Sequence, residues 1–113
     1  MPRDPNVYLE DILEAVQRIR RYLEGYDLAR FKTDTRTADA VIRNLEIVGE
    51  AVKKLPPEIR AKQRSVDWVK IGSLRDILIR EYFGVDLEIL WDVVSSKLPD
   101  LEQAVKKLLD SSP

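Results

Sequence analysis

Apolar side chains that recur every three or four residues constrain the fold of this chain more than any other sequence feature. Between Asp4 and Tyr26 the apolar positions are Ile12, Ala15, Val16, Ile19, Tyr22, Leu23 and Tyr26, and charged residues separate them. Such spacing places the apolar side chains on one face of an α-helix. The pattern predicts an amphipathic helix over residues 4–26.

A second helix is predicted from Asp34 or Thr35 to Leu55. The preceding segment, with Gly25, Asp27 and residues 31–35, weakens the helical pattern and supplies capping residues. The apolar period then runs through Ala38, Val41, Ile42, Leu45, Val48, Ala51, Val52 and Leu55. Two consecutive prolines follow and end the helix, so residues 57–62 are predicted to be a short helical turn or loop.

Three more helices are predicted in the second half of the chain. The first starts near Ser65 or Asp67 and runs to about Phe83, where Gly84 ends it. A shorter one, which Asp86 can cap, contains Leu87, Leu90, Trp91 and Val94. The last has Pro99 in its first turn and contains Leu101, Ala104, Val105, Leu108 and Leu109.

These patterns predict an all-α fold without strands. A chain of 113 residues, 44% of them hydrophobic, is large enough for one core and too small for two. We therefore expect residues 1–113 to form a single helical domain, an up-and-down bundle of four or five helices.

Two residue types are absent, and their absence limits the chemistry. The chain has no cysteine and no histidine. A disulfide, a thiolate metal site and a cysteine nucleophile are therefore impossible, and the side chain that normally titrates near neutral pH is missing. We expect neither a metal nor a cofactor. A helical di-iron enzyme, which needs Glu-x-x-His motifs, is set aside for the same reason.

Charge and hydropathy give no sign of a membrane or of a strongly basic surface. The 19 basic and 20 acidic residues leave a net charge of −1, so any contact with RNA must come from a local basic patch. No segment approaches the roughly 18 apolar residues that cross a bilayer. Because the N-terminus also lacks the apolar region of a signal peptide, a cytoplasmic location is expected.

The helix predicted to begin near Trp68 is apolar over about half of its circumference. With Trp68 at zero and about 100° per residue, the apolar arc runs from roughly 180° to 20°. Its other members are Ile71, Leu74, Ile77, Leu78 and Ile79. A helix of this kind buries two sides, one in its own bundle and the other against another molecule. Homodimerisation through this helix is therefore our hypothesis.

Polar residues on the same helix can be interpreted in two ways. Arg75 lies inside the apolar arc, at about 340°, and Tyr82 lies beside it at about 320°. Arg75 either pairs with an acid along the apolar surface or binds an anion such as a phosphate. Tyr82 alone is consistent with an aromatic residue at the edge of the core. Arg80 and Asp76, at about 120° and 80°, would form an ordinary solvated pair of no functional weight.

The run from Leu74 to Asp86 resembles the signature of the HepT-like toxins of the HEPN superfamily. That motif consists of arginine, a polar residue, three more residues, histidine, one residue and tyrosine. Arg75, Asp76 and Tyr82 match it. The likeness extends to residues 45–51, to the Trp68 region and to residues 87–92, and so covers nearly the whole chain.

This resemblance implies a homodimeric all-α bundle in which two motifs face a shared cleft and cleave RNA without a metal. The implied catalytic residues are Arg75, Asp76 and position 80, and Arg75 and Arg80 are the implied RNA-binding residues. The implied partner is a small nucleotidyltransferase antitoxin, which in some such families adenylylates the motif tyrosine, here Tyr82. A non-enzymatic helical dimerisation or binding module remains the alternative function.

Position 80 departs from the motif, because Arg80 stands where the family has histidine. RNA cleavage without a metal needs one group that accepts the proton of the 2′-hydroxyl and another that protonates the leaving oxygen. A guanidinium with a pKa above about 12 cannot accept that proton. Arg80 can still bind phosphate together with Arg75. We therefore predict weak RNA binding with little or no cleavage, through either natural degeneration or loss of the histidine during cloning.

Two further positions upstream, Gly49 and Glu50, deserve an interpretation. Glycine within a helix costs roughly 1 kcal/mol relative to alanine, and the close approach of a neighbouring helix is the usual reason for it. Gly49 is therefore interpreted as a packing residue. Glu50 is one candidate to balance the charge of Arg75 if that arginine is buried.

Overall fold

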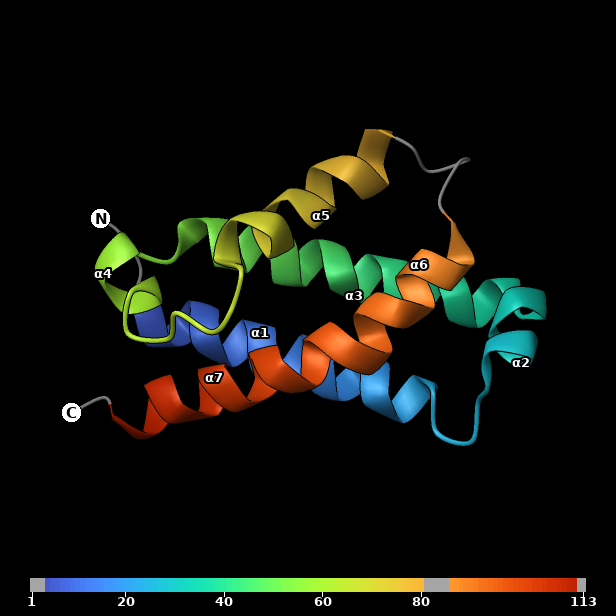
Figure 1. Cartoon of the computed structure of the whole chain (residues 1–113), viewed down its shortest axis with the longest axis horizontal. Coiled ribbons are helices and arrows are strands. Elements are labelled where there is room, and N and C mark those ends of the chain that lie inside the picture. Colours follow the sequence, from blue (N-terminus) through green and yellow to red (C-terminus); the bar gives the residue numbers. More distant parts are fainter. Residues whose placement is uncertain (1–3, 81–85, 112–113) are drawn as a thin grey trace.

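The computed structural model of the chain describes residues 4–80 and 86–111, and at Arg75 and residues 77–80 it describes the backbone alone. The described residues form helices and contain no strand. Four long segments run alternately in opposite directions, as Figure 1 shows. They are α1 (Pro5–Tyr22), α3 (Thr35–Lys54), α5 (Trp68–Arg80) and the segment that ends in α7 (Leu98–Asp110). The predicted all-α, up-and-down bundle is confirmed.

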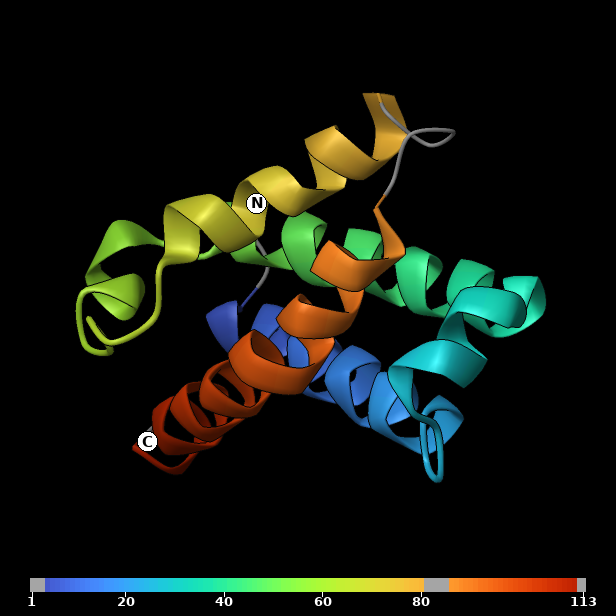
Figure 2. The ribbon, with the colours of Figure 1, turned by 45° about the vertical axis from the view of Figure 1, so that its right-hand side comes forward.

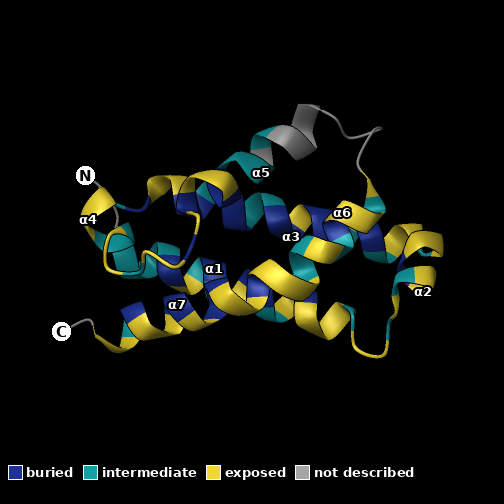
Figure 3. Cartoon of the chain, in the orientation of Figure 1, coloured by how far each residue is buried: buried dark blue, intermediate teal, exposed yellow. Residues whose placement is uncertain are grey.

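Helix α3 is the centre of the bundle, since α1 and α5 both pack extensively against it and α7 packs against α1. The apolar stripes predicted from the sequence form this core. In α1 the buried residues are Leu9, Ile12, Ala15, Val16 and Ile19, and in α3 they include Val41, Leu45, Val48 and Val52, all fully buried. Figure 3 shows the buried residues on the inward faces of these helices and the exposed ones outside.

Helix α1 is shorter than predicted, and a helix that the sequence did not predict follows it. The helix ends at Tyr22, and the chain then turns through Gly25, whose φ of 75° is the left-handed conformation that glycine adopts without strain. Asp27 caps the additional helix α2 (Leu28–Thr33) by accepting a hydrogen bond from the backbone N–H of Arg30. Because α2 is six residues long, it is too short to show a helical period.

Helix α2 connects the start of α6 (Leu87–Asp92) to the rest of the bundle. Phe31 is fully buried, and its ring lies 5.4 Å from the ring of Trp91. Lys32 of α2 forms an ion pair with Glu88 of α6 at 2.9 Å. These contacts hold α6 against α2.

The second and third of the helices predicted in the second half join into one bent helix. Helix α6 continues through a π-helical turn, η2 (Val93–Lys97), directly into α7, and Figure 2 shows the continuous path from α6 to α7. Pro99, predicted in the first turn of a separate helix, is the second residue of α7. Proline has no N–H to donate to the preceding turn, so the wider π-helical turn before it lets the helix continue.

Polar contacts join the remaining segments. Glu102 of α7 is buried and pairs with Arg20 of α1 and with Lys106 of its own helix. The predicted short turn after the two prolines is helix α4 (Pro57–Arg60). The indole N–H of Trp68 donates to the backbone carbonyls of Arg60 and Gln63 at 3.1 and 2.9 Å, which attaches the start of α5 to the loop before it.

Within the described ranges, no helix is both long and apolar enough to cross a membrane.

Asp34 caps α3 and should make the stability of the bundle sensitive to acid. Its carboxylate accepts hydrogen bonds from the Tyr26 hydroxyl at 2.5 Å and from the Thr37 hydroxyl and backbone N–H at 2.9 and 3.1 Å. These hydrogen bonds lower the pKa of Asp34 from 3.8 to about 2. The bond from Tyr26 has the largest effect, and those from Thr37 follow. The folded state thus holds this carboxylate ionised at a pH where the unfolded chain binds a proton.

We therefore expect the free energy of unfolding to fall as the pH drops from about 4 to about 2, because the contribution of Asp34 is complete above its unfolded pKa and is lost through its folded pKa. Urea denaturation across this range measures it. Asp34→Asn, which can still cap the helix but does not titrate, should show a smaller loss. Equal losses in both proteins would show that Asp34 is not the source.

Candidate functional site

The predicted site lies on α5, which packs closely on α3 through its first two turns. Trp68 and Ile71 are 6% and 8% exposed, and Gly72 is also buried. A Cβ atom at Gly72 would lie 3.3 Å from Cγ of Lys53 and 3.7 Å from Cγ1 of Val52, both on α3. The absence of a side chain at position 72 therefore leaves room for these two α3 side chains to lie directly against α5.

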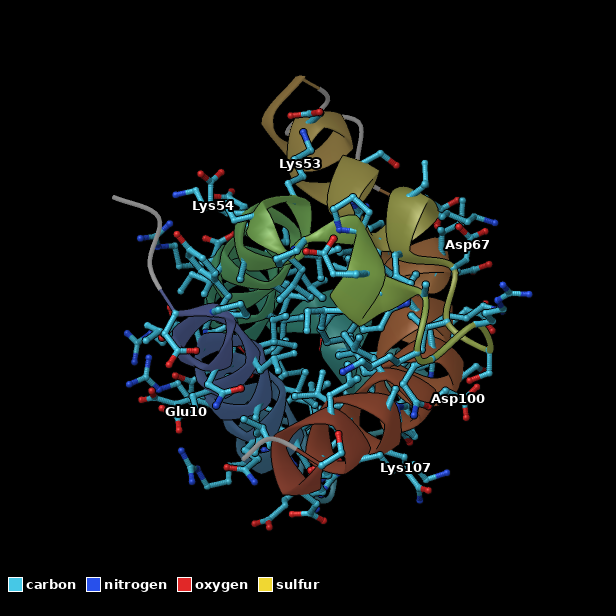
Figure 4. All side chains as sticks on the ribbon, turned by 90° about the vertical axis from the view of Figure 1, so that its left-hand side faces the viewer. Glu10, Lys53, Lys54, Asp67, Asp100 and Lys107 are labelled. Carbon is cyan, nitrogen blue, oxygen red and sulfur yellow. The ribbon has the colours of Figure 1, made fainter. Side chains whose placement is uncertain are left out.

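Asp76 is bound by a residue that the sequence analysis did not identify. The ammonium group of Lys53 donates a hydrogen bond to Oδ2 of Asp76 at 2.5 Å, and the two side chains are 42% and 35% exposed. Figure 4 shows Lys53 reaching from the end of α3 toward α5. Asp76 was predicted to pair with Arg80, whose side chain lies outside the described part of the structure, so that pair stays a prediction.

The backbone places Arg75 and Arg80 on the same helix but on different flanks. Because α5 is α-helical as far as Arg80, the two positions differ by about 140° around the helix axis. Arg75 lies on the face that carries the buried Trp68 and Ile71, and Asp76 lies between the two arginine positions. Tyr82 is outside the described residues. Side chains for a shared cleft would thus come from two flanks of a regular helix.

The predictions for Gly49 and Glu50, both on α3, can be compared with the structure separately. Gly49 is buried within α3, in agreement with its predicted packing role. Glu50 pairs with Lys54, one turn later on the same helix, at 3.4 Å. A pair between Glu50 and Arg75 remains a prediction, since only the backbone of Arg75 is described.

A partly apolar groove lies between α5, α6, η2 and α7. It has a volume of about 290 Å³, and its apolar lining includes Ile71, Leu74, Ile89, Val93 and Leu101. Ile89 is 65% exposed, and Val69 of α5 is 77% exposed. Aliphatic side chains this exposed are candidates for contact with another molecule. No group of three or more carboxylates that could hold a metal ion occurs among the described residues.

The described structure is an all-α up-and-down bundle with Arg75, Asp76 and Arg80 on α5. Residues 12–108 match the family model described as Ribonuclease HepT-like. The chain therefore belongs to the HepT-like ribonuclease family, and the resemblance seen in the sequence is confirmed. No solved structure matches the chain.

Several relatives are about 40% identical to the chain over the aligned residues. A protein of Methanocaldococcus jannaschii named "Gamma-glutamylcyclotransferase and putative RNase" is 42% identical over 110 residues, which are 97% of this chain and 50% of that protein. A "Putative RNase" of Caldanaerobacter subterraneus is 41% identical, with 95% of this chain and 96% of the relative covered. "Probable ribonuclease HepT" of Thermococcus cleftensis is 39% identical, with 96% and 98% covered. The chain thus spans half of the first relative and nearly all of the other two.

Proposed function

We propose that this chain is the ribonuclease-type toxin of a toxin–antitoxin pair and that its cleavage activity is impaired because Arg80 replaces the histidine of the motif. The observation that carries the proposal is the arginine at position 80 in a chain that belongs to the HepT-like family and matches the motif at Arg75, Asp76 and Tyr82. The proposed site consists of these four residues and acts on RNA in the cytoplasm without a metal or cofactor.

The chemistry of RNA cleavage explains why position 80 matters. The ribose 2′-oxygen forms a bond to the adjacent phosphorus while the bond from phosphorus to the 5′-oxygen breaks, which leaves a 2′,3′-cyclic phosphate and a 5′-hydroxyl. The 2′-hydroxyl proton must pass to a base, and the 5′-oxygen must receive a proton from an acid. Two guanidinium groups can hold the phosphate and stabilise its negative charge, but neither accepts a proton near neutral pH. The site keeps electrostatic stabilisation and lacks a base.

Arg80→His should therefore raise the rate of RNA cleavage. General acid–base catalysis is worth on the order of 10²–10⁴-fold, so we expect a gain of at least about 10²-fold on a fluorescent single-stranded RNA. Cleavage should persist in EDTA, and Arg75→Ala in the Arg80→His protein should abolish it.

Arg64→His, on an exposed arginine in the loop before α5, is the matched control and should not cleave. An Arg80→His protein that is folded by circular dichroism and still inert would contradict the nuclease proposal. Cleavage that EDTA abolishes would contradict metal independence.

We further propose that two copies of the chain associate through α5 and the groove beside it. The exposed Ile89 in a groove with Ile71 and Leu74 supports this, since burial of such a surface in a dimer removes apolar area from water. Two copies would bring two sets of motif residues toward one cleft.

Light scattering during size-exclusion chromatography at micromolar concentration should give twice the monomer mass of 13.1 kDa. Ile89→Asp should shift the protein toward monomer, because a charge in the groove opposes its burial. Gln103→Asp, at an exposed position of α7, should not. A monomer at all concentrations for the unsubstituted chain would contradict the dimer.

The proposed protein partner is a small nucleotidyltransferase that acts as antitoxin. It would transfer AMP from ATP to the phenolic oxygen of Tyr82, with pyrophosphate as the leaving group. The support is the tyrosine at the motif position two residues after Arg80. A second candidate function, a non-enzymatic binding module, is favoured by the arginine at position 80 together with the exposed Ile89. A nucleotidyltransferase reading frame beside the gene would favour the toxin.

A further inference from the structure

We infer that Lys53 is a positioning residue for the proposed ribonuclease site: together with Gly72 and Asp76 it fixes the rotation of α5 against α3 and so the directions of positions 75 and 80. This inference rests on the proposed function, which it deepens. Nothing in the motif includes Lys53, which lies in the last turn of α3, 22 residues before Arg75 in the sequence.

The path of the Lys53 side chain shows how the contact is built. Its Cγ atom lies 3.3 Å from the place where a Cβ of residue 72 would stand, so the stem crosses α5 directly over Gly72. Its ammonium group then reaches the carboxylate of Asp76, one helical turn further on, at 2.5 Å. A side chain at position 72 would occupy the space beside the stem. Gly72 thus leaves room for the Lys53 stem, and Asp76 binds its ammonium group.

The position of this contact around α5 connects it to the arginines. On the helical wheel Gly72 and Asp76 lie at about 40° and 80°, between Arg75 at about 340° and position 80 at about 120°. Lys53 therefore contacts α5 on the strip that separates the two flanks. A rotation of α5 about its axis would break the contact and would turn both arginine positions in the same sense.

The contact lies about one to two turns beyond the residues that fix the start of α5. The buried Trp68 and Ile71 and the hydrogen bonds of the Trp68 indole fix the first turn of the helix. Asp76 is next to Arg75 in the sequence. Lys53 therefore ties the turn of α5 that carries the first motif residue directly to α3.

The energetic character of the pair makes it testable. Ion pairs that are more than a third exposed contribute little to global stability, so substitutions at Lys53 should leave the bundle folded. Catalysis is far more sensitive, because a misplacement of about 1 Å can cost about 10²-fold in rate. An ion pair with no positioning role would affect neither the stability of the bundle nor the rate of catalysis.

The test compares Lys53→Met, Lys53→Arg and Lys54→Met, each in the Arg80→His protein, by the kcat and KM of RNA cleavage. Lys53→Met keeps most of the stem and removes the charge, and we expect kcat to fall about tenfold with KM nearly unchanged. Lys53→Arg, which can still reach Asp76, should restore most of kcat. Lys54→Met is the matched control: it removes the same charge from the neighbouring residue, whose contacts are Glu50 on its own helix and the Tyr8 ring on α1 rather than α5, and it should leave kcat unchanged.

A rise in KM without a fall in kcat would overturn the inference, because Lys53 would then bind RNA directly. An equal effect of Lys54→Met would overturn it as well, because the total charge would then be the cause.

Amide hydrogen exchange separates failure of this inference from failure of the proposed function. In the chain with Arg80, Lys53→Met should speed exchange at the amides of α5 and leave those of α1 unchanged, whereas Lys54→Met should change neither. If Arg80→His is inert, the proposed function fails, and faster exchange in α5 still supports the contact between the helices. If exchange in α5 is unchanged by Lys53→Met, Lys53 does not hold this helix and the inference fails even when Arg80→His is active.

Discussion

The close packing of α5 on α3 is the constraint on which the rest of the site depends. Gly72 leaves room for the side chains of Lys53 and Val52 of α3 against α5, and Trp68 and Ile71 bury the first turn of α5 in the core. The direction of every later residue of α5 follows from that placement, because an α-helix fixes the angle between successive residues. The backbone positions of Arg75 and Arg80 are thus set in part by residues outside the motif.

The helices around the motif hold the two helices on either side of it in place. Helix α2 holds the start of α6 through Phe31 and Lys32, and α5 is held by α3. In the proposed function, arginine at position 80 replaces the proton-transfer group, while the described core is built by residues of the other helices and of the first turn of α5.

The sequence predicted the long helices well because each has an apolar stripe that repeats over several turns. It missed α2 because a six-residue helix with one buried residue, Phe31, is too short to show that period. It separated α6 from α7 because Pro99 usually marks a helix start, and a π-helical turn leaves no simple pattern.

The site was predictable only in part. A motif on one helix can be read from the order of its residues, and Arg75, Asp76 and Arg80 do lie on α5. The contact of Lys53 with Asp76 could not be read in this way, since it joins exposed charges on two helices. Many other charged residues of this chain are also exposed, and the sequence alone does not show which of them form ion pairs.

The central claim is that the residue at position 80 transfers the proton in this family and that arginine there cannot do so. The pH dependence of kcat for RNA cleavage by the Arg80→His protein tests this most directly. An imidazole that must be neutral to accept a proton should give a rate that falls below about pH 6.5, the ordinary pKa of histidine. A measurable rate that does not change between about pH 5 and pH 8 would contradict the account, because no group of that pKa would then take part.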